Sequence, residues 1–472
     1  MDRDLMQEDA VGLVELFRNK TVSPSEYLEE VLTNISNSKL NAFCYLDEQN
    51  ARNVAALADV WLPFGGVPFG IKQLDPVKGW PFTGASLVFK DRVADYDATY
   101  LTRLKNAGAV FVGQTTASEF GGINCTSTKI NGITRNPWNL DKTPGGSSGG
   151  SAASIAAGLI PIATGGDGGG SIRIPAGFTN LFGLKVTYGR VPKGPKSEIG
   201  ALTAVLGCLS KSVRDTARFL DVTNGYDTRD TLSLSKVEGY EKHLGTLNVS
   251  GLKVVVTPNF FGAAYVNPSV ETMIEDSAEV LIKSCKLNKV NVKVSDFPKL
   301  SLSWAMSNTV GLFSELENFY PDCADDLTGE INFILNVASH NYNIKTAAQS
   351  EKERKDFNEK MADVFDEADL IITATNPDTA FDARGPMPTK VGQVDLIKEF
   401  GFEKAIGNNG ALTIPANMYG CPAMSLPIGT LESMPVGMQV IAKHNSEDIL
   451  LDLAYRFEKT KPWTLICPNS PV

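Results

Sequence analysis

The sequence predicts an α/β protein: a single large domain with a central mixed, mostly buried β-sheet covered by helices on both faces. Short apolar runs of the kind found in buried strands alternate with segments of helical periodicity. The composition, 43% hydrophobic and 21% charged, suits a chain with a large core. No repeat, low-complexity tract or interdomain linker is visible. One domain over residues 1–472 is therefore expected, although this length also allows two to four domains.

The strands of this sheet are expected where short apolar runs are bounded by glycine or polar residues. The first two lie in a region dense in glycine, serine and threonine, and the first of these ends in Lys72. Such short apolar runs are typical of strands buried on both faces. The expected strands cover residues 66–72, 107–113, 252–257, 370–375 and 434–442.

The helices are expected from apolar positions that recur at helical spacing and from start signals. The segment Ser23-Pro24-Ser25-Glu26 has the form of a capping box with proline at the first helical position. Asn267 before Pro268 is a second such start. The expected helices cover residues 7–17, 24–35, 151–159, 268–283, 446–457 and much of the polar stretch 320–366.

The charge of the chain argues about partners and location. The formal net charge is −10 and the isoelectric point is about 5.1. Phosphate binding needs clustered lysine and arginine, so no nucleic acid partner is expected. The acidic start, Met1 to Leu5, does not resemble a secretory signal, and no unbroken apolar run could span a membrane. We therefore expect no membrane association and a cytoplasmic location.

The cysteines and histidines give no sign of a metal site. The seven cysteines are scattered and never form a C-x-x-C pair, which also argues against a disulfide framework. The three histidines, His243, His340 and His444, stand in no ligand motif. We therefore expect neither a metal nor a cofactor. A serine–histidine–aspartate triad is not excluded by counting, but none of these histidines lies in a suggestive setting.

Two glycine-rich loops stand out, at residues 143–151 and 165–176, and both carry serines. Glycine lets neighbouring backbone N–H groups point into one space, where they can hold a phosphate or the oxyanion of an acyl-transfer intermediate. Phosphate fits poorly, because neither loop matches a nucleotide-binding motif. Tight packing of the loops without chemistry is the remaining alternative, and the paired serines weigh against it.

An ordered set of motifs in and around these loops resembles the amidase-signature family. The resemblance is dense from about residue 66 to 215 and returns from about residue 413 to the C-terminus. It rests on Gly66-Val67-Pro68-Phe69-Gly70-Ile71-Lys72, Thr134-Arg135-Asn136-Pro137-Trp138-Asn139, Gly145-Gly146-Ser147-Ser148-Gly149-Gly150-Ser151, Gly169 to Ala176, Gly183-Leu184-Lys185, Thr187 to Val191, Ser212 to Asp215, Thr413 to Asn417, Gly420 to Ala423 and Pro435 to Gln439.

The resemblance implies a catalytic trio. By position in the motifs, Ser171 is similar to the nucleophile, Ser147 to the bridging serine and Lys72 to the base. The chemistry is consistent, because a serine hydroxyl needs a base in contact with it, and a lysine can be that base only when neutral. Burial away from a carboxylate favours the neutral form. Ser171 would then form an acyl-enzyme with an amide substrate.

The surroundings of the trio follow from the same resemblance. The backbone N–H groups of Gly168, Gly169 and Gly170, with that of Ser171, are the expected oxyanion hole. The family also has a cis peptide bond before the bridging serine. Asp167 and Arg173 flank the nucleophile and are expected to orient its loop through hydrogen bonds rather than to transfer protons.

The chain departs from the family pattern at two places. Gly166 and Gly168 flank Asp167 where the family often has threonine on both sides. Backbone N–H donors survive this change, so the oxyanion hole is not put in doubt. Gln73 follows Lys72 where the family often has aspartate, which alters the environment of the lysine.

The expected function is that of a stand-alone amidase that cleaves a small carboxamide to an acid and ammonia or an amine. The alternatives are the glutamine-hydrolysing A subunit of a tRNA-dependent amidotransferase and a binding protein that has kept the fold. The catalytic core is expected at about 66–215 and 411–472, with a variable substrate-pocket region at about 225–410. The expected partners are a small-molecule amide and, as one option, a second copy in a homodimer. The sequence does not identify the amide.

Overall fold

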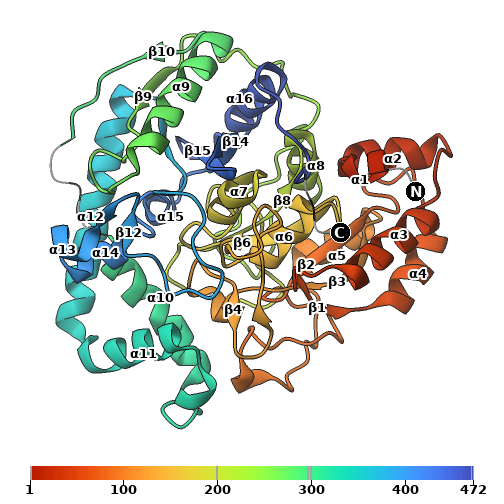
Figure 1. The fold of residues 1–472 in the computed structure, drawn as a ribbon, viewed down its shortest axis with the longest axis horizontal. Coiled ribbons are helices and arrows are strands. Elements are labelled where there is room, and N and C mark those ends of the chain that lie inside the picture. Colours follow the sequence, from red (N-terminus) through yellow and green to blue (C-terminus); the bar gives the residue numbers. More distant parts are fainter. Residues whose placement is uncertain (1–2, 198–199, 295–296, 298–299, 469, 471–472) are drawn as a thin grey trace.

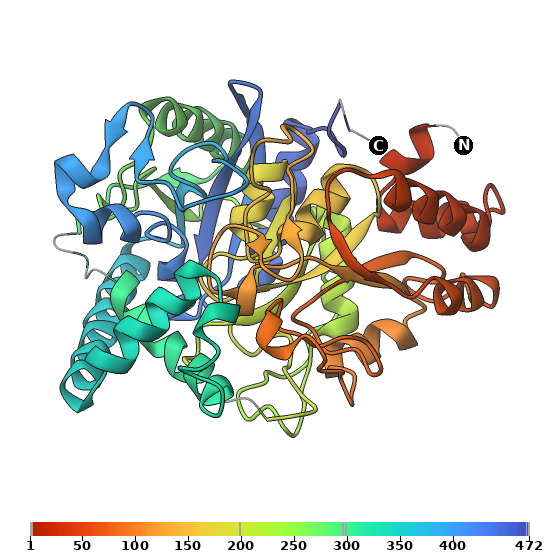
Figure 2. The ribbon, with the colours of Figure 1, turned by 60° about the horizontal axis from the view of Figure 1, so that its bottom comes forward.

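The structure is a computed structural model that describes residues 3–197, 200–294, 297, 300–468 and 470. Figures 1 and 2 show helices α1 to α4 at one end of the molecule and the helices of the middle segment, α10 to α14, at the other. The glycine-rich segments lie between these two ends. In the part of the chain that the structure describes, no helix is both long and apolar enough to cross a membrane.

A mixed sheet of eleven strands runs through the described chain, in the order β1-β3-β2-β6-β8-β7-β14-β15-β11-β9-β10. Strand β2 is parallel to β3 and β6, β9 is parallel to β10 and β11, and the other neighbours are antiparallel. These strands are β1 Phe43–Leu46, β2 Pro68–Lys72, β3 Val110–Thr115, β6 Ile162–Asp167, β7 Phe182–Lys185, β8 Val205–Ser210, β9 Lys253–Val256, β10 Asn288–Lys289, β11 Leu370–Ala374, β14 Ala423–Leu431 and β15 Met434–Ala442. Two short ribbons lie outside the sheet, formed by β4 Ser127–Thr128 with β5 Gly132–Ile133 and by β12 Lys390–Val391 with β13 Val394–Asp395.

Helices cover both faces of the sheet. Gly207 of β8 faces Ile172 at the start of α7, whose Cδ1 lies 3.0 Å from where a Cβ on this glycine would stand. The next residue, Cys208, instead contacts Thr216 of α8, with 3.5 Å between Sγ and Oγ1. Because successive strand residues point to opposite faces, α7 and α8 lie on opposite sides of the sheet. The predicted α/β fold class is confirmed.

The helices of the described chain vary from one turn to 24 residues in α12. They are α1 Arg3–Gln7, α2 Ala10–Arg18, α3 Pro24–Asn37, α4 Glu48–Ala56, α5 Thr99–Asn106, α6 Gly149–Ala156, α7 Arg173–Thr179, α8 Val213–Thr223, α9 Pro268–Cys285, α10 Ser301–Leu316, α11 Gly329–Asn341, α12 Ile344–Glu367, α13 Leu396–Phe400, α14 Phe402–Gly407, α15 Ile414–Tyr419 and α16 Glu447–Thr460. The expected capping box at Ser23 is present, and the Asn267 side chain caps α9.

The helix expected over residues 7–17 is wrong at its start. Helix α1 ends at Gln7, and α2 begins at Ala10. The Asp9 side chain accepts a hydrogen bond from the backbone N–H of Gly12, so it caps a new helix instead of continuing the first. Asp9 also pairs with Arg214 of α8, at 2.6 Å between Oδ2 and Nε. Asp9 and Arg214 are far apart in the sequence, so a local sequence pattern cannot predict their contact.

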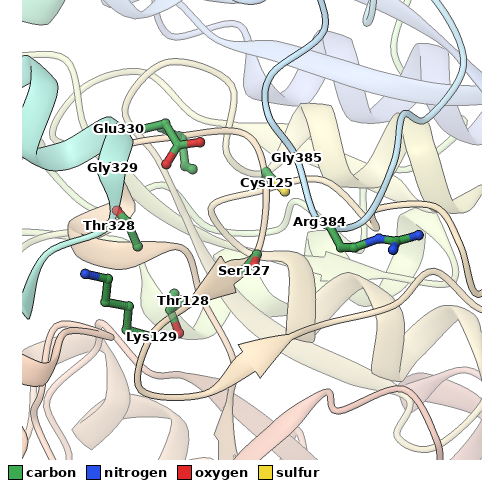
Figure 3. A pocket seen from close by; sticks show the side chains of 10 residues that line it. Cys125, Ser127, Thr128, Lys129, Thr328, Gly329, Glu330, Arg384 and Gly385 are labelled. Atoms are coloured by element: carbon green, nitrogen blue, oxygen red, sulfur yellow. The ribbon is translucent and has the colours of Figure 1, made fainter.

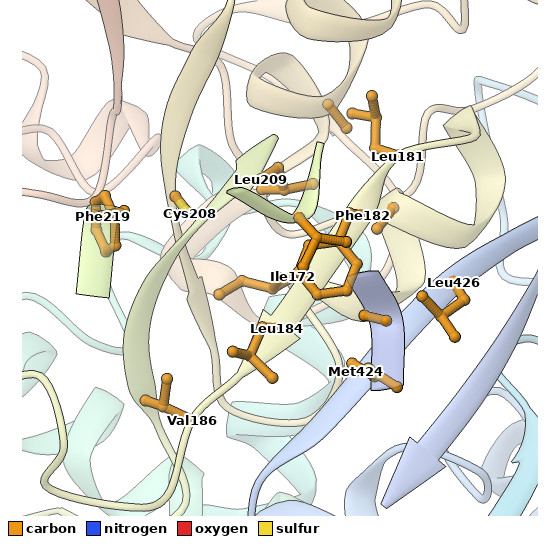
Figure 4. Close-up of a cluster of buried hydrophobic side chains, with 14 of the residues drawn as sticks. Ile172, Leu181, Phe182, Leu184, Val186, Cys208, Leu209, Phe219, Met424 and Leu426 are labelled. Atoms are coloured by element: carbon orange, nitrogen blue, oxygen red, sulfur yellow. The ribbon is translucent and has the colours of Figure 1, made fainter. Parts of the chain in front are cut away.

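Buried apolar side chains beneath the second glycine-rich loop fix its end. Figure 4 shows Ile172 among Phe182, Leu184 and Leu209. Ile172 is fully buried and directly follows Ser171. Burying such a side chain stabilises the fold by about 1.5–3 kcal/mol. The core therefore holds the backbone next to the expected nucleophile in one place.

Candidate active site

Lys72 is the last residue of β2, and its side chain is held inside the molecule. It is 2% exposed, and its Nζ donates a hydrogen bond to the Ser147 Oγ at 2.7 Å. Its backbone N–H donates to the Thr164 Oγ1 of β6 at 2.8 Å. Burial lowers the pKa of Lys72 to about 8, although the nearby carboxylates Asp75 and Asp167 oppose this shift. A substantial neutral fraction is therefore present at mildly alkaline pH.

Ser147 lies in the first glycine-rich loop, just before α6. The peptide bond between Gly146 and Ser147 is cis, as the resemblance implies. The loop packs against the chain without room for a side chain at Gly146, where a Cβ would come within 2.8 Å of the Ile123 carbonyl oxygen. The Ser147 carbonyl also accepts the N–H of Ser118 at 3.2 Å. These contacts hold the backbone of the loop in the position from which the Ser147 hydroxyl meets Lys72.

Ser171 lies in the second loop, two residues before α7 begins, and remains partly exposed. Within the described part of the chain, no recorded hydrogen bond joins its hydroxyl to Ser147. The structure therefore brings Lys72 and Ser147 into direct contact, whereas the Ser147 and Ser171 hydroxyls are not hydrogen-bonded to each other in the described chain. Catalytic hydrogen bonds are often loose without substrate and tighten when it binds.

A buried ionic network holds the Ser171 loop. Asp167 and Arg173 are both buried, and the guanidinium donates to the carboxylate from Nε and Nη2, each at 2.9 Å. Arg173 also donates to the carbonyl of Thr413 and to the side chains of Asn417 and Gln439. Burial alone would raise the pKa of Asp167, but Arg173 and Asn417 outweigh it and hold this pKa below its ordinary range. The network is well suited to the loop-orienting role expected for Asp167 and Arg173.

The backbone of the expected oxyanion hole is fixed by two further contacts. The Trp304 Nε1 donates to the Gly168 carbonyl at 2.7 Å, and the Thr413 Oγ1 donates to the Gly169 carbonyl at 2.6 Å. Within a trans peptide the C=O and N–H point in opposite directions. The N–H of Gly169 therefore points away from Trp304. The N–H of Gly170 donates to the Asp167 Oδ1 at 2.8 Å.

This last hydrogen bond changes the set of available donors. Gly170 was expected to offer its N–H to an oxyanion, and here that N–H is used to hold the loop. The N–H groups of Gly168, Gly169 and Ser171 take part in no recorded hydrogen bond within the described chain. Gly170 keeps a necessary role, because its φ of +129° is a conformation that only glycine adopts freely.

Several residues of this site were not assigned a role from the sequence. Trp304 donates to the Gly168 carbonyl, and the Asn417 side chain accepts from Arg173 and donates to Asp167, although the sequence assigns neither side chain a role. The buried Glu119 carboxylate accepts from the backbone N–H and the hydroxyl of Thr328, at 2.7 and 2.6 Å, and so ties the start of α11 to the core. Asp75, three residues after the end of β2 at Lys72, also carries no motif signal. No local signal marks these residues, since each acts on a distant segment.

A cavity of about 260 Å³ opens beside the Ser147 loop. Ile123 and Cys125 line it, and their backbone atoms also pack against Gly146. Figure 3 shows side chains of both charges around this space: Lys129 from the turn between β4 and β5, Glu330 at the start of α11 and Arg384 from a later loop. The cavity therefore lies between residues 123–129, next to the Ser147 loop, and residues 328–330 and 384–385 of the middle segment.

The described residues contain no group of three or more histidine, cysteine, aspartate or glutamate side chains that could hold a metal ion. The expectation that the protein needs neither a metal nor a cofactor stays a prediction. No disulfide joins any of the seven cysteines in the described chain.

The family model for amidases matches residues 26–451. Among curated proteins, the chain is 32% identical over 501 aligned residues to the A subunit of the glutamyl-tRNA(Gln) amidotransferase of Clostridium botulinum, with 99% of this chain and 100% of the relative covered. Among solved structures, a bacterial aryl acylamidase of the amidase-signature family superposes with a TM-score of 0.88 at 27% identity, with 97% of each chain covered. The A subunit of the glutamyl-tRNA(Gln) amidotransferase of Thermotoga maritima gives a TM-score of 0.76 at 25% identity, with 100% of this chain and 99% of that chain covered.

These relatives correct the expectation about partners. A small-molecule amide without any nucleic acid was expected, yet the curated relative is named as part of an enzyme of glutamyl-tRNA(Gln). The expectation was wrong because it rested on the net charge of −10. Net charge describes the surface of this chain alone, and one component of a larger enzyme can serve a tRNA-dependent reaction without clustered lysine and arginine of its own.

The family match spans nearly the whole chain, and it agrees with the eleven-stranded sheet flanked by helices. The chain belongs to the amidase family and is an enzyme that cleaves carbon–nitrogen amide bonds.

Proposed function

We propose that Ser171 attacks the carbonyl carbon of a carboxamide while Ser147 and neutral Lys72 remove its proton. One observation carries this proposal: the Lys72 Nζ lies 2.7 Å from the Ser147 Oγ at a buried site. A lysine with its pKa lowered to about 8 can accept a proton from a hydroxyl, whereas an ordinary surface lysine stays charged.

The proton steps balance over one turnover. Ser171 gives its proton to Ser147 as its oxygen bonds to the carbonyl carbon, and Ser147 gives its own proton to Lys72. The resulting lysinium returns a proton through Ser147 to the leaving nitrogen, and the carbon–nitrogen bond breaks to leave an acyl-enzyme on Ser171. Water then attacks the acyl carbon and gives one proton through Ser147 to Lys72, and that proton returns through Ser147 to the Ser171 oxygen as its bond to the acyl carbon breaks and the acid leaves. The N–H groups of Gly168, Gly169 and Ser171 are the proposed donors to the oxyanion.

The substrate that we propose is the side-chain amide of glutamine, hydrolysed by the chain as the A subunit of a tRNA-dependent amidotransferase. This alternative is better supported than the stand-alone amidase preferred from the sequence. Its support is a curated relative that aligns over the whole of both chains at 32% identity and is named as such a subunit. The ammonia released from glutamine would then serve the amidation of a glutamyl-tRNA.

A second candidate is a stand-alone amidase that acts on an aryl or alkyl amide. It is favoured by the TM-score of 0.88 to the aryl acylamidase, against 0.76 to the amidotransferase subunit of Thermotoga maritima. Both candidates use the same catalytic trio, so they differ only in the substrate and in the need for other subunits. The expected cytoplasmic location suits both and stays a prediction.

The test is a hydrolysis panel with the purified chain. Glutamine, an aliphatic amide, an anilide and a short peptide amide are offered, and release of ammonia or amine is measured. Each assay is repeated with companion amidotransferase subunits and glutamyl-tRNA(Gln). Glutamine hydrolysis that rises when these are added supports the amidotransferase role. Rapid anilide hydrolysis by the chain alone, with no response to glutamine in either form of the assay, would overturn this substrate in favour of the second candidate. Ser171→Ala is the control that must abolish every activity.

A further inference from the structure

Asp75 is a buried carboxyl group placed directly behind the Lys72 side of the site. It lies in the turn that follows β2, and its backbone N–H donates to the Lys72 carbonyl at 2.8 Å. The residue is only 4% exposed. A carboxylate in such a position is costly unless it is hydrogen-bonded, so its contacts show what it is used for.

The Asp75 carboxyl reaches Lys72 through Thr164. The Thr164 Oγ1 donates to the Asp75 Oδ2 at 2.7 Å and accepts from the backbone N–H of Lys72 at 2.8 Å. A hydroxyl has one proton, and here it is committed to the carboxylate. A lone pair of the same oxygen is therefore left to face the Lys72 N–H. Asp75 thus fixes the orientation of the Thr164 hydroxyl, and this hydroxyl joins Lys72, the last residue of β2, to β6.

The charged and titratable groups around Lys72 come from four elements. Asp75 lies in the turn after β2, and Asp167 ends β6. The buried Tyr100 hydroxyl of α5 lies beside Asp75, and Cys208 of β8 lies near Tyr100. The charge of Asp167 is matched by Arg173 at 2.9 Å. The hydrogen-bond partner of the Asp75 carboxyl at 2.7 Å is a neutral hydroxyl, so its charge acts on Lys72 with less compensation.

We propose that Asp75 is a positioning residue for Lys72: through Thr164 it holds the lysine backbone in place, and its negative charge sets the pH at which the lysine becomes a neutral base. This role rests on the proposed function, in which Lys72 is the base. It also explains the Gln73 departure, because the Gln73 side chain contacts Thr83 and Asn131 instead of Lys72. A carboxyl is supplied two residues later.

The test measures the reactivity of Ser171 with a fluorophosphonate reagent as a function of pH, so it needs no natural substrate. Asp75→Asn removes the charge but keeps an oxygen that can accept from Thr164. Loss of a nearby negative charge favours the neutral lysine, so the alkaline rise in labelling rate should move to lower pH by about one unit. The matched control is Asp215→Asn. Asp215 is also buried, but it accepts from the N–H groups of Ala10 and Val11 at the start of α2, and its variant should leave the profile in place.

The outcomes separate this inference from the function beneath it. If Lys72→Met is unreactive while Asp75→Asn keeps the wild-type midpoint, the role of Asp75 is refuted and the catalytic trio stands. If the wild-type rate is flat with pH and Lys72→Met still reacts, the proposed base itself is wrong.

Thr164→Val tests the hydroxyl bridge between Asp75 and Lys72 without changing charge. It should lower the plateau rate without a shift to lower pH, and an unchanged plateau would contradict the positioning role. The same variant carries the test if Asp75→Asn does not fold.

Discussion

Two of the buried lysines of this protein, Lys72 and Lys211, share a lowered pKa but differ in what they contact. Lys72, at the end of β2, and Lys211, between β8 and α8, are both buried, and burial lowers the pKa of each to about 8. Lys72 donates to a serine hydroxyl at 2.7 Å, whereas Lys211 donates to the backbone carbonyls of Met6 and Glu8 at 2.6 and 3.0 Å. A hydroxyl can pass a proton to a neutral amine, and a carbonyl cannot. A lowered pKa therefore marks burial, and only the acceptor distinguishes a candidate base from a structural lysine.

The largest effect is expected for Lys72→Met, measured as kcat/KM or as the rate of active-serine labelling. Loss of a general base typically costs about 10²–10⁴-fold in rate. The variant should fold, because methionine fills a similar volume and removes a group that is costly to bury. A folded variant with near wild-type activity would show that Lys72, like Lys211, is a structural lysine and not the base.

The second effect concerns the hydroxyl that distinguishes the Lys72 site. Ser147→Ala should be severely impaired but should still form a slow acyl-enzyme on Ser171, because a water can partly replace the missing hydroxyl. The measurement is active-serine labelling followed by peptide mass mapping. The label should lie on the peptide that contains Ser171 in the wild type and in the variant. A wild-type label found mainly on Ser147 would reverse the two serine roles.

The third effect is on stability alone. Lys211→Met leaves the carbonyls of Met6 and Glu8 without their donor, so the free energy of unfolding should fall by about 1–3 kcal/mol. Urea unfolding measures this loss. The activity of the folded variant should stay within about twofold of wild type, since well-separated sites that share no partners are usually independent. A large drop in kcat/KM without unfolding would show that Lys211 also serves the site.

The site around Lys72 shows which features can be predicted from the sequence and which cannot. The strand that ends in Lys72 and the loop that carries Ser147 could be predicted, because glycine, short apolar runs and motif order are local properties. The partners that complete the site could not. Asp75 meets Thr164 across 89 residues, Trp304 meets Gly168 across 136, and Thr328 meets Glu119 across 209. Strand order likewise depends on pairings that no local pattern encodes.

The split between α1 and α2 has the same cause. Apolar periodicity predicts one helix over residues 7–17, but the Asp9 cap starts α2 at Ala10, with support from Arg214 of α8. The Gly170 N–H is a second feature that the sequence could not predict, on the scale of one hydrogen bond. The glycine run indicates a set of free donors, and only the folded loop shows that Asp167 takes one of them.

The last expected effect is a pH dependence of stability that Lys211 contributes without any effect on activity. Its pKa is about 8 in the folded protein, below the value of about 10.4 for an unperturbed lysine. Below pH 8 both states hold the proton, so this group adds no slope. Between pH 8 and 10.4 the unfolded state binds the proton and the folded state does not, so stability rises with pH by at most about 1.4 kcal/mol per unit.

The difference in unfolding free energy between wild type and Lys211→Met should therefore be constant up to about pH 8 and grow above it. Urea unfolding of both proteins at pH 7, 8, 9 and 10 measures this difference, and other titrating groups cancel in the comparison. Lys72→Met should remove a similar slope, because its pKa is also about 8. A difference that shrinks with rising pH would mean that Lys211 is buried as a stabilised cation, and the two lysines would then differ in charge as well as in their acceptors.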